Sequence, residues 1–218
     1  MQATYPARYR DAHGEIATTI RNHGKTLRMA LCGVEFEGTD FDSLELACAG
    51  EGADTSRFTF SAGSLCACTL ELELPLTVVA AGREVAATLE VRLRLGGPKT
   101  NGGIESEDLG LGLTAGGTRL QSRGETGWFE DELADLQRQV PEGDFLKICF
   151  GCAWSDYSPA GHGLYGGLAC FRGNKAGYAA ASTKEDMLRI WRTVTEWVQE
   201  TYLCPEFERR KPGTGYRG

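Results

Sequence analysis

The sequence contains no run of about 20 uninterrupted apolar residues, which is the length that a membrane-spanning helix requires. Its first residues also lack the basic and then apolar pattern of a secretion signal, so we expect a cytoplasmic protein that does not enter a membrane. Disulfide bonds are rare in that reducing compartment. The eight cysteines of the chain are therefore expected either to bind a metal or to be buried as free thiols.

Several motifs of nucleotide-binding and hydrolytic enzymes are also missing. The glycine pairs at 102–103 and 116–117 are not followed by the Gly-Lys-Ser/Thr ending of a P-loop. No dinucleotide fingerprint, nucleophile elbow or His-Glu-x-x-His sequence occurs. These absences remove the enzyme classes that a sequence identifies most readily.

Basic charge is scarce in the body of the chain. The 23 basic side chains are outnumbered by 30 acidic ones, which gives a net charge of −7. Because phosphate backbones repel such a surface, we expect no nucleic-acid binding through the body of the protein. Residues 201–218 reverse the sign, with four basic side chains against two acidic ones, and are expected to form a solvated terminus.

The first half of the chain has the alternating pattern of antiparallel strands. Every second residue is apolar over 66–76, and the same period of two returns over 85–95. The segment 80–83 between them predicts a turn, so the two runs form a long hairpin. Pro75 cannot donate a hydrogen bond to a ladder and is expected at an edge or a bulge. Weaker alternation over 27–60 predicts further short strands.

Four of the eight cysteines fall in this strand-rich half. Cys66 and Cys68 share the apolar face of their strand with leucines. We therefore interpret them as small buried hydrophobic residues rather than as a second metal site. Cys32 and Cys48 receive the same interpretation.

The last third of the chain mixes helices and strands. Apolar spacing predicts a helix over 128–140, with acidic side chains in its first turn. A strand is predicted over 144–150, and a second strand over 167–172 returns antiparallel to it. A further short strand is predicted over 177–181.

A second helix is predicted to follow. Ser182 and Glu185 have the spacing of a capping box, and an apolar stripe continues behind them to about residue 202. The chain is therefore predicted to be α+β, with an antiparallel, sandwich-like β half at 1–125. A helix–hairpin–helix region is predicted at 126–218, either as a second unit or as part of one continuous domain.

Four cysteines are the most informative feature of this region: Cys149, Cys152, Cys170 and Cys204. The first two form a Cys-x-x-Cys pair, and two thiolates at that spacing can hold one metal ion. If the chain brings the other two beside them, the four complete a structural zinc site with no open position for substrate. The alternatives are unliganded cysteines and thioredoxin-like redox chemistry, whose motif would open a helix where this chain has a glycine-rich turn.

The polar loop after this pair is the second candidate site. It contains Ser155, Asp156, Tyr157 and His162, and Arg172 follows the next predicted strand. If Asp156 and His162 converge, the histidine can act as the general base of a hydrolase-like enzyme. The alternative is a turn-forming aspartate and a surface histidine between two glycines. We favour this non-enzymatic interpretation.

The run from Cys149 to Tyr178 contains Cys-Phe-Gly-Cys, Ser-Asp-Tyr-Ser-Pro, Cys-Phe-Arg and Lys-x-x-Tyr, and the chain closes with Cys-Pro-Glu-Phe and Gly-Tyr-Arg-Gly. These pieces, in about the last 75 residues, resemble a bacterial family of uncharacterised proteins. The resemblance implies a domain of unknown function, with some relatives similar to immunity-type proteins encoded near toxins. An acidic body suits that role, because complementary charge steers association with a basic protein partner such as a nuclease.

Overall fold

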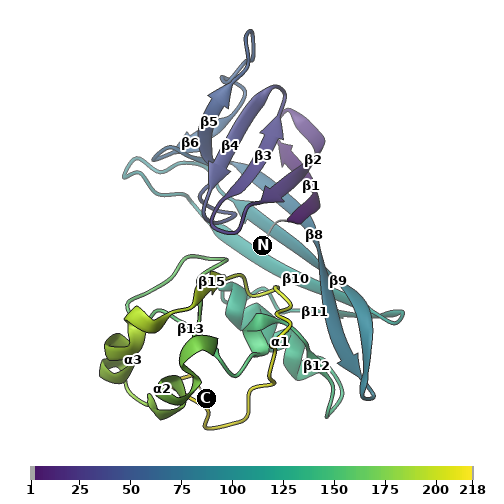
Figure 1. The fold of residues 1–218 in the computed structure, drawn as a ribbon. Helices are drawn as coiled ribbons and strands as arrows, with labels where there is room; N and C mark the ends of the chain where they lie inside the picture. The colour runs from purple at the N-terminus through teal and green to yellow at the C-terminus, as the bar shows by residue number, and fades with distance from the viewer. Residues whose placement is uncertain (1–2, 218) are drawn as a thin grey trace.

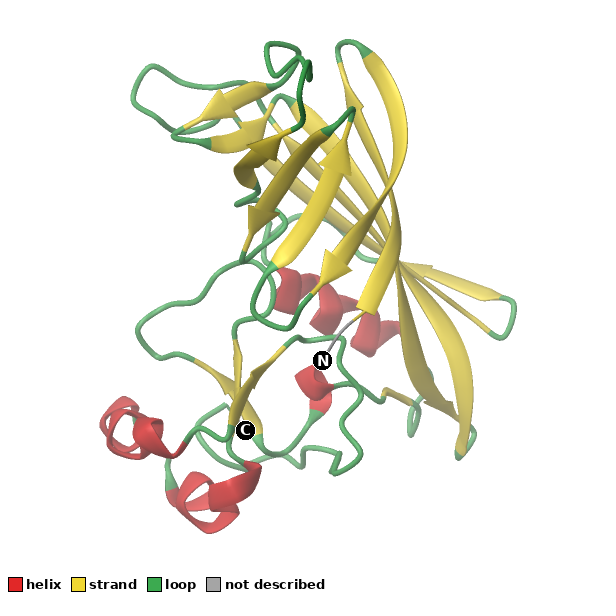
Figure 2. Cartoon of the chain, turned by 45° about the horizontal axis from the view of Figure 1, so that its top comes forward, coloured by secondary structure: helices red, strands yellow, loops and turns green. Residues whose placement is uncertain are grey.

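The structure is a computed structural model and describes residues 3–217. A large antiparallel sheet forms the first half of the chain, and helices gather in the last third (Figures 1 and 2). This arrangement confirms the prediction of an α+β protein with a β-rich N-terminal half. The division into 1–125 and 126–218 stays a prediction. None of the helices in residues 3–217 combines the length and apolar character that a membrane span requires.

The elements of the first half are all strands. They are β1 (Ala3–Asp11), β2 (Gly14–Asn22), β3 (Leu27–Leu31), β4 (Val34–Gly38), β5 (Glu45–Ala49), β6 (Thr59–Ser61), β7 (Ser64–Cys66), β8 (Cys68–Ala80), β9 (Arg83–Leu95), β10 (Glu107–Ala115) and β11 (Thr118–Gln121).

The elements of the last third are shorter. They are α1 (Phe129–Gln139), β12 (Phe145–Leu146), the 3-10 helix η1 (Cys149–Gly151), β13 (Ser155–Tyr157), β14 (Leu168–Cys170), the 3-10 helix η2 (Arg172–Asn174), α2 (Lys175–Ala180), α3 (Lys184–Ile190), the 3-10 helix η3 (Trp191–Thr193) and β15 (Glu196–Val198).

The large sheet closes on itself through a kinked strand. Strands β7 and β8 are separated by one residue, Ala67, whose φ of 52° is in the left-handed region. The start of this kinked strand pairs with β5 and residues 69–72 of its continuation pair with β1, while β1 to β5 pair in sequence. The ring of strands encloses apolar side chains that alternate along strands such as β1, β3 and β4, among them Tyr9, Met29 and Phe36.

The predicted hairpin is confirmed as β8 and β9. These strands pair over 13 positions, from Cys68 opposite Leu95 to Ala80 opposite Arg83. The hairpin extends past the ring of strands (Figure 1). Pro75 pairs with Thr88 on one side only, because the bridges from β8 to β1 and to β12 lie on either side of it in the chain. A proline in this half-paired position leaves no ladder hydrogen bond unmade.

The helix predicted over 128–140 is confirmed as α1, which covers one face of the sheet beside β10. Phe129, Leu133 and Leu136 on its apolar stripe join the main core. Tyr165, from a later loop, joins the same core and stacks on Phe41 with 4.5 Å between ring centroids. The last third of the chain therefore packs directly against the ring of strands.

Two strand predictions in the last third are wrong. The segment 144–150 forms only the two-residue strand β12, and Cys149 begins the 3-10 helix η1 instead of ending a strand. The segment 177–181 is mostly the helix α2, because the side chain of Asn174 accepts a hydrogen bond from the Gly177 N–H and caps it. The strand β14 pairs with β13 and β15, not with β12.

The second predicted helix is much shorter than expected. Its capping box lies one residue later, where the Thr183 and Asp186 side chains each accept the other's backbone N–H at 3.1 Å. The helix α3 ends at Ile190, and residues 196–198 form β15 against β14. The β-branched residues at 193–195 favour this change from helix to strand.

The interpretation of the first four cysteines is half correct. Cys66 and Cys68 are buried, as predicted. Cys32 and Cys48 are exposed, which contradicts the prediction. Cys32 occupies the two-residue turn between β3 and β4 with a φ of 51°, and Cys48 lies on β5, a strand exposed along its whole length. A turn position removes a side chain from the alternation that buries its neighbours.

Candidate functional site

The four cysteines of the last third occupy one neighbourhood. All four are buried, and Cys149, Cys170 and Cys204 belong to a single apolar cluster. Burial raises the pKa of the Cys149 thiol, and the nearby Cys152, Cys204 and Cys170 thiols raise it further. Each of the other three thiols is therefore close enough to Cys149 to raise the pKa of its thiol. Within residues 3–217, no set of three or more Cys, His, Asp or Glu side chains has the arrangement of a metal-binding group.

Backbone hydrogen bonds hold these cysteines in place. The N–H groups of Cys149 and Phe150 donate to the carbonyls of Tyr202 and Glu200, at 2.7 and 2.9 Å. These two bonds bring the segment that ends at Cys204 against the Cys-x-x-Cys turn. Cys170 ends β14, whose neighbours β13 and β15 fix it from both sides.

The Cys204 sulfur atom receives two N–H donors. The Glu206 N–H donates to Cys204 Sγ at 3.3 Å, and Arg172 Nη1 lies 3.5 Å from the same sulfur. Backbone N–H groups of Cys204 and Arg172 act on Cys149 and Cys170 and lower the pKa values of these thiols against the effect of burial. Hydrogen bonds of this kind favour the thiolate, the form in which cysteine binds a metal.

The three loop residues Ser155, Asp156 and Tyr157 form β13 and are all buried. The Ser155 hydroxyl donates to the Cys149 carbonyl at 2.5 Å. Asp156 lies on the opposite face of the strand, where it accepts the Tyr178 hydroxyl at 2.8 Å. The serine and the aspartate are therefore engaged in internal hydrogen bonds.

His162 does not meet Asp156, so the predicted general-base pair is not formed. Its ring stacks on Tyr157 with 4.1 Å between centroids, and its Nε2 lies 3.1 Å from the Glu130 carboxylate at the start of α1. Burial raises the pKa of Glu130, while the nearby His162 lowers it. Arg172 pairs with Glu196 and lies beside the cysteines.

A fully buried carboxylate, Glu200, lies beside this group and was missed by the sequence analysis. Tyr157 donates its hydroxyl to Oε1 at 3.2 Å, and the Gly166 N–H donates to Oε2 at 2.7 Å. Burial raises the pKa of Glu200 to about 7, and its hydrogen bonds oppose that rise. The sequence places Glu200 at the end of an apolar stripe and gives no signal that it is buried.

Polar contacts also join the last third to the ring of strands. The Tyr165 hydroxyl lies 2.6 Å from the Thr201 hydroxyl, and the Tyr165 N–H donates to Asp40 at 2.7 Å. The buried Asn22 side chain donates to the Tyr5 hydroxyl at 2.9 Å and to Gln199. Because these groups are buried and paired, they fix the orientation of the two parts.

The basic terminus is folded against the protein, which corrects the expectation of a solvated tail. Arg210 donates to the Cys152 carbonyl at 2.9 Å and to the Tyr178 hydroxyl at 3.0 Å. The Arg217 guanidinium lies over the rings of Phe150 and Tyr157, at 5.0 and 5.4 Å from their centroids. Carbonyl and aromatic partners draw these cations onto the Cys-x-x-Cys turn.

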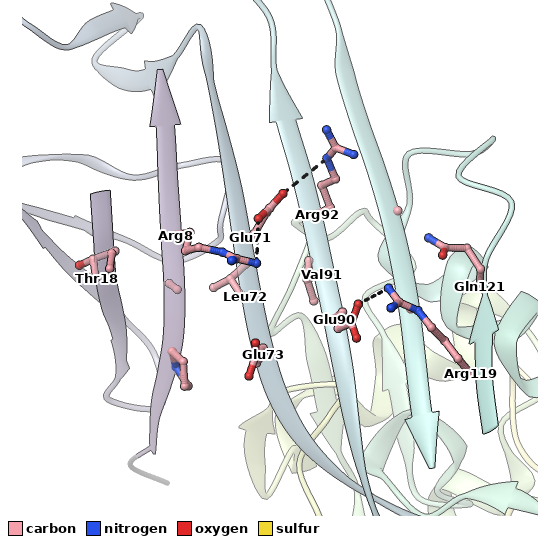
Figure 3. Close-up of a pocket in the computed structure, with 15 residues that line it drawn as sticks. Arg8, Thr18, Glu71, Leu72, Glu73, Glu90, Val91, Arg92, Arg119 and Gln121 are labelled. Carbon is pink, nitrogen blue, oxygen red and sulfur yellow. Dashed lines mark hydrogen bonds and ion pairs between the residues drawn. The ribbon is translucent and has the colours of Figure 1, made fainter. Parts of the chain in front are cut away.

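A hollow of the surface lies elsewhere, over the polar face of β1, β8, β9 and β10 (Figure 3). Its volume is about 810 Å³. Arg8 and Arg92 approach Glu71 at 3.2 and 3.9 Å, and Arg119 pairs with Glu90. The groove is lined by three arginines and three glutamates, so it offers no site of one sign to a ligand.

Comparison with known proteins gives a family but no function. A family model described as "Family of unknown function (DUF6304)" matches residues 3–155. No curated protein and no solved structure matches the chain. The match covers the strand-rich half and the Cys-x-x-Cys pair, whereas most of the motifs behind the resemblance lie beyond its end. Since the match spans more than half of the chain, this protein belongs to that family of unknown function.

Proposed function

We propose that this chain is a cytoplasmic protein-interaction protein of the immunity type, whose last third is stabilised by one structural zinc ion bound to Cys149, Cys152, Cys170 and Cys204. The observation that supports the zinc ion is that four buried thiols lie in one neighbourhood, where Cys152, Cys204 and Cys170 all act on the pKa of Cys149, and that the Cys204 sulfur accepts N–H donors. Four thiolates around zinc leave no open position, so the ion would stabilise the fold without catalysing a reaction.

Free thiols account for the cluster less well. Buried thiols without a metal pack as small hydrophobic residues and need no hydrogen-bond donors. Here the buried Cys204 sulfur accepts the Glu206 N–H and lies 3.5 Å from Arg172 Nη1. Such donors compensate the negative charge of zinc-bound thiolates.

Thermal melting tests the zinc ion through its link to folding. A strong zinc chelator is expected to lower the melting temperature of the wild-type protein, because the free energy of metal binding contributes to folding. The Cys149→Ser variant should melt at a lower temperature and should no longer respond to the chelator. The matched control is Cys48→Ser, an exposed cysteine outside the cluster, which should behave as wild type. Unchanged melting of Cys149→Ser would contradict the proposal.

The proposed partner is a basic protein, and the distribution of charge supports this choice. Residues 105–144 carry ten acidic and three basic side chains, a difference equal to the whole net charge of −7. Trp128, at the start of α1 in this segment, is 49% exposed. An exposed tryptophan among carboxylates has the character of an interface residue for a positively charged surface. Nucleic acid is not proposed as a partner, for the same electrostatic reason.

The partner test begins with the product of a toxin-type gene beside the gene for this chain. We expect the two purified proteins to form a complex whose association slows as salt is added. Glu125→Lys/Asp131→Lys should slow association, and Trp128→Ala should speed dissociation. The control is Glu45→Lys/Glu51→Lys, which makes the same change in net charge on an exposed strand and loop distant in sequence from the acidic segment. Equal binding by all variants, or no complex, would contradict the role.

The hydrolase-like alternative receives little support from the loop contacts. The Ser155 hydroxyl donates its hydrogen bond to the Cys149 carbonyl, and His162 faces Glu130 and not Asp156. A nucleophile and a base within hydrogen-bond reach of each other are what that chemistry requires.

A further inference from the structure

A basic pocket lies between the Cys-x-x-Cys turn and the terminal segment. Its volume is about 320 Å³. Four of its lining side chains are cationic: Arg209, Arg210, Lys211 and Arg217. The lining also includes the apolar residues Phe145, Leu146 and Pro212. This pocket is unlike the large groove on the sheet, since it carries charge of one sign.

The positive charge of the pocket is not neutralised by ion pairs within residues 3–217. The nearest acidic residues along the chain, Glu206 and Glu208, pair instead with Arg172 and Lys175. The charge of Asp156 raises the pKa of Arg217. The two carboxylate oxygens of Asp156, however, already accept hydrogen bonds from Tyr157 and Tyr178. A protein with a net charge of −7 thus keeps its concentrated positive charge at one pocket.

Two buried donors of the pocket have no hydrogen-bond partner within residues 3–217. They are the Arg210 Nε and Arg217 Nη1 atoms. Burial lowers the pKa of Arg217, and the charge of Arg210 lowers it further. Leaving a buried charged donor unpaired is costly, and each such group in a native protein calls for an explanation. An anion bound in the pocket would offset the positive charge of these two guanidinium groups.

The cations are held in position before any ligand arrives. Arg210 donates to the carbonyls of Cys152 and Thr214, at 2.9 and 2.8 Å. Arg209 lies 4.3 Å from the centroid of the Phe145 ring and donates to the Gly143 carbonyl at 3.2 Å. Binding therefore requires little ordering of these side chains, which favours affinity.

We propose that this pocket binds a small phosphate monoester, with the phosphate among the four cations and its organic group against Phe145 and Pro212. Guanidinium groups match the oxygens of phosphate through paired, charge-assisted hydrogen bonds. Four cations suit a dianionic phosphate better than a singly charged carboxylate. The volume is at the lower end of ligand pockets, which begin at about 300 Å³, and this limits the organic group to a small one.

Calorimetric titration with phenyl phosphate, inorganic phosphate and benzoate tests this pocket. We expect phenyl phosphate to bind best, inorganic phosphate to bind more weakly because it lacks the ring, and benzoate to bind least. The test variant is Arg209→Gln/Lys211→Gln, because both side chains are exposed and their loss leaves the buried contacts intact. This variant should lose affinity for phenyl phosphate by about tenfold or more, since it removes two phosphate contacts.

Controls make each outcome decisive. The control variant Lys184→Gln/Arg192→Gln removes two exposed cations outside the pocket and should bind phenyl phosphate as the wild type does. Melting curves establish that both variants fold. The proposal is overturned if the wild type binds neither phosphate compound at about 10 mM, a very weak affinity limit. It is also overturned if benzoate binds as well as phenyl phosphate, or if the two double variants bind equally.

Discussion

Replacing Glu200 with Gln is expected to stabilise the protein above pH 7 and to flatten its stability profile below that pH. Glu200 is fully buried, and burial raises its pKa from the ordinary 4.5 to about 7. The folded state therefore holds a proton that the unfolded state releases. A glutamine has no proton to lose, and its amide can donate to Tyr157 while its carbonyl accepts the Gly166 N–H.

The magnitude follows from the size of the pKa change. A shift from 4.5 to about 7 corresponds to about 3 kcal/mol, because each pKa unit is worth about 1.4 kcal/mol. Since the folded-state pKa is the higher one, the stability from this group is complete below pH 4.5 and is lost as the pH rises to about 7. The variant and the wild type should therefore be similar at low pH and differ by about 3 kcal/mol above pH 7.

Urea unfolding across this pH range measures the difference directly. The control is Glu185→Gln, an exposed carboxylate on α3, which should leave the pH profile of the wild type unchanged. Asp40 and Glu130 also have raised pKa values because they are partly buried, so some slope will remain in every variant. Parallel profiles for wild type and Glu200→Gln would refute the reasoning.

Two further substitutions test the packing. Gly215→Ala should destabilise the protein by about 1–3 kcal/mol more than Gly213→Ala. Both glycines have positive φ, but a Cβ at Gly215 meets the buried Tyr178 ring, whereas a Cβ at Gly213 faces open space. Equal urea midpoints for the two variants would contradict the contact with Tyr178. Leu74→Ala, fully buried in the main core, should cost about 2–5 kcal/mol, whereas Leu46→Ala on the exposed β5 should change the free energy of unfolding by about 0.5 kcal/mol or less.

The parts of the fold that could be predicted are those with long, regular patterns. The strands β8 and β9 alternate through most of their 13 positions, and α1 carries a complete apolar stripe with an acidic first turn. Patterns of this length leave one consistent secondary structure. The shorter elements of the last third are decided by tertiary pairing, as in β15, where a stripe that would suit a helix contains a strand bound to β14.

The candidate site shows the same limit. The gathering of the four cysteines around Cys149 could be anticipated from their number and position, but not the route, which runs through η1, β14 and the segment after β15. The partner of His162 could not be predicted, because Glu130 lies 32 positions earlier in the chain. Nothing in the sequence indicates that Glu200 and Arg217 are buried, because burial of a charged side chain depends on contacts between distant segments.

The zinc content of the intact protein tests the central claim most directly. The chain should be purified without a chelator or a metal column and weighed by mass spectrometry under native and denaturing conditions. We predict one zinc ion per chain in the native spectrum, its loss on denaturation, and its absence in Cys170→Ser and Cys204→Ser. A folded wild-type protein that carries no metal and gains none from added zinc would contradict the four-cysteine site.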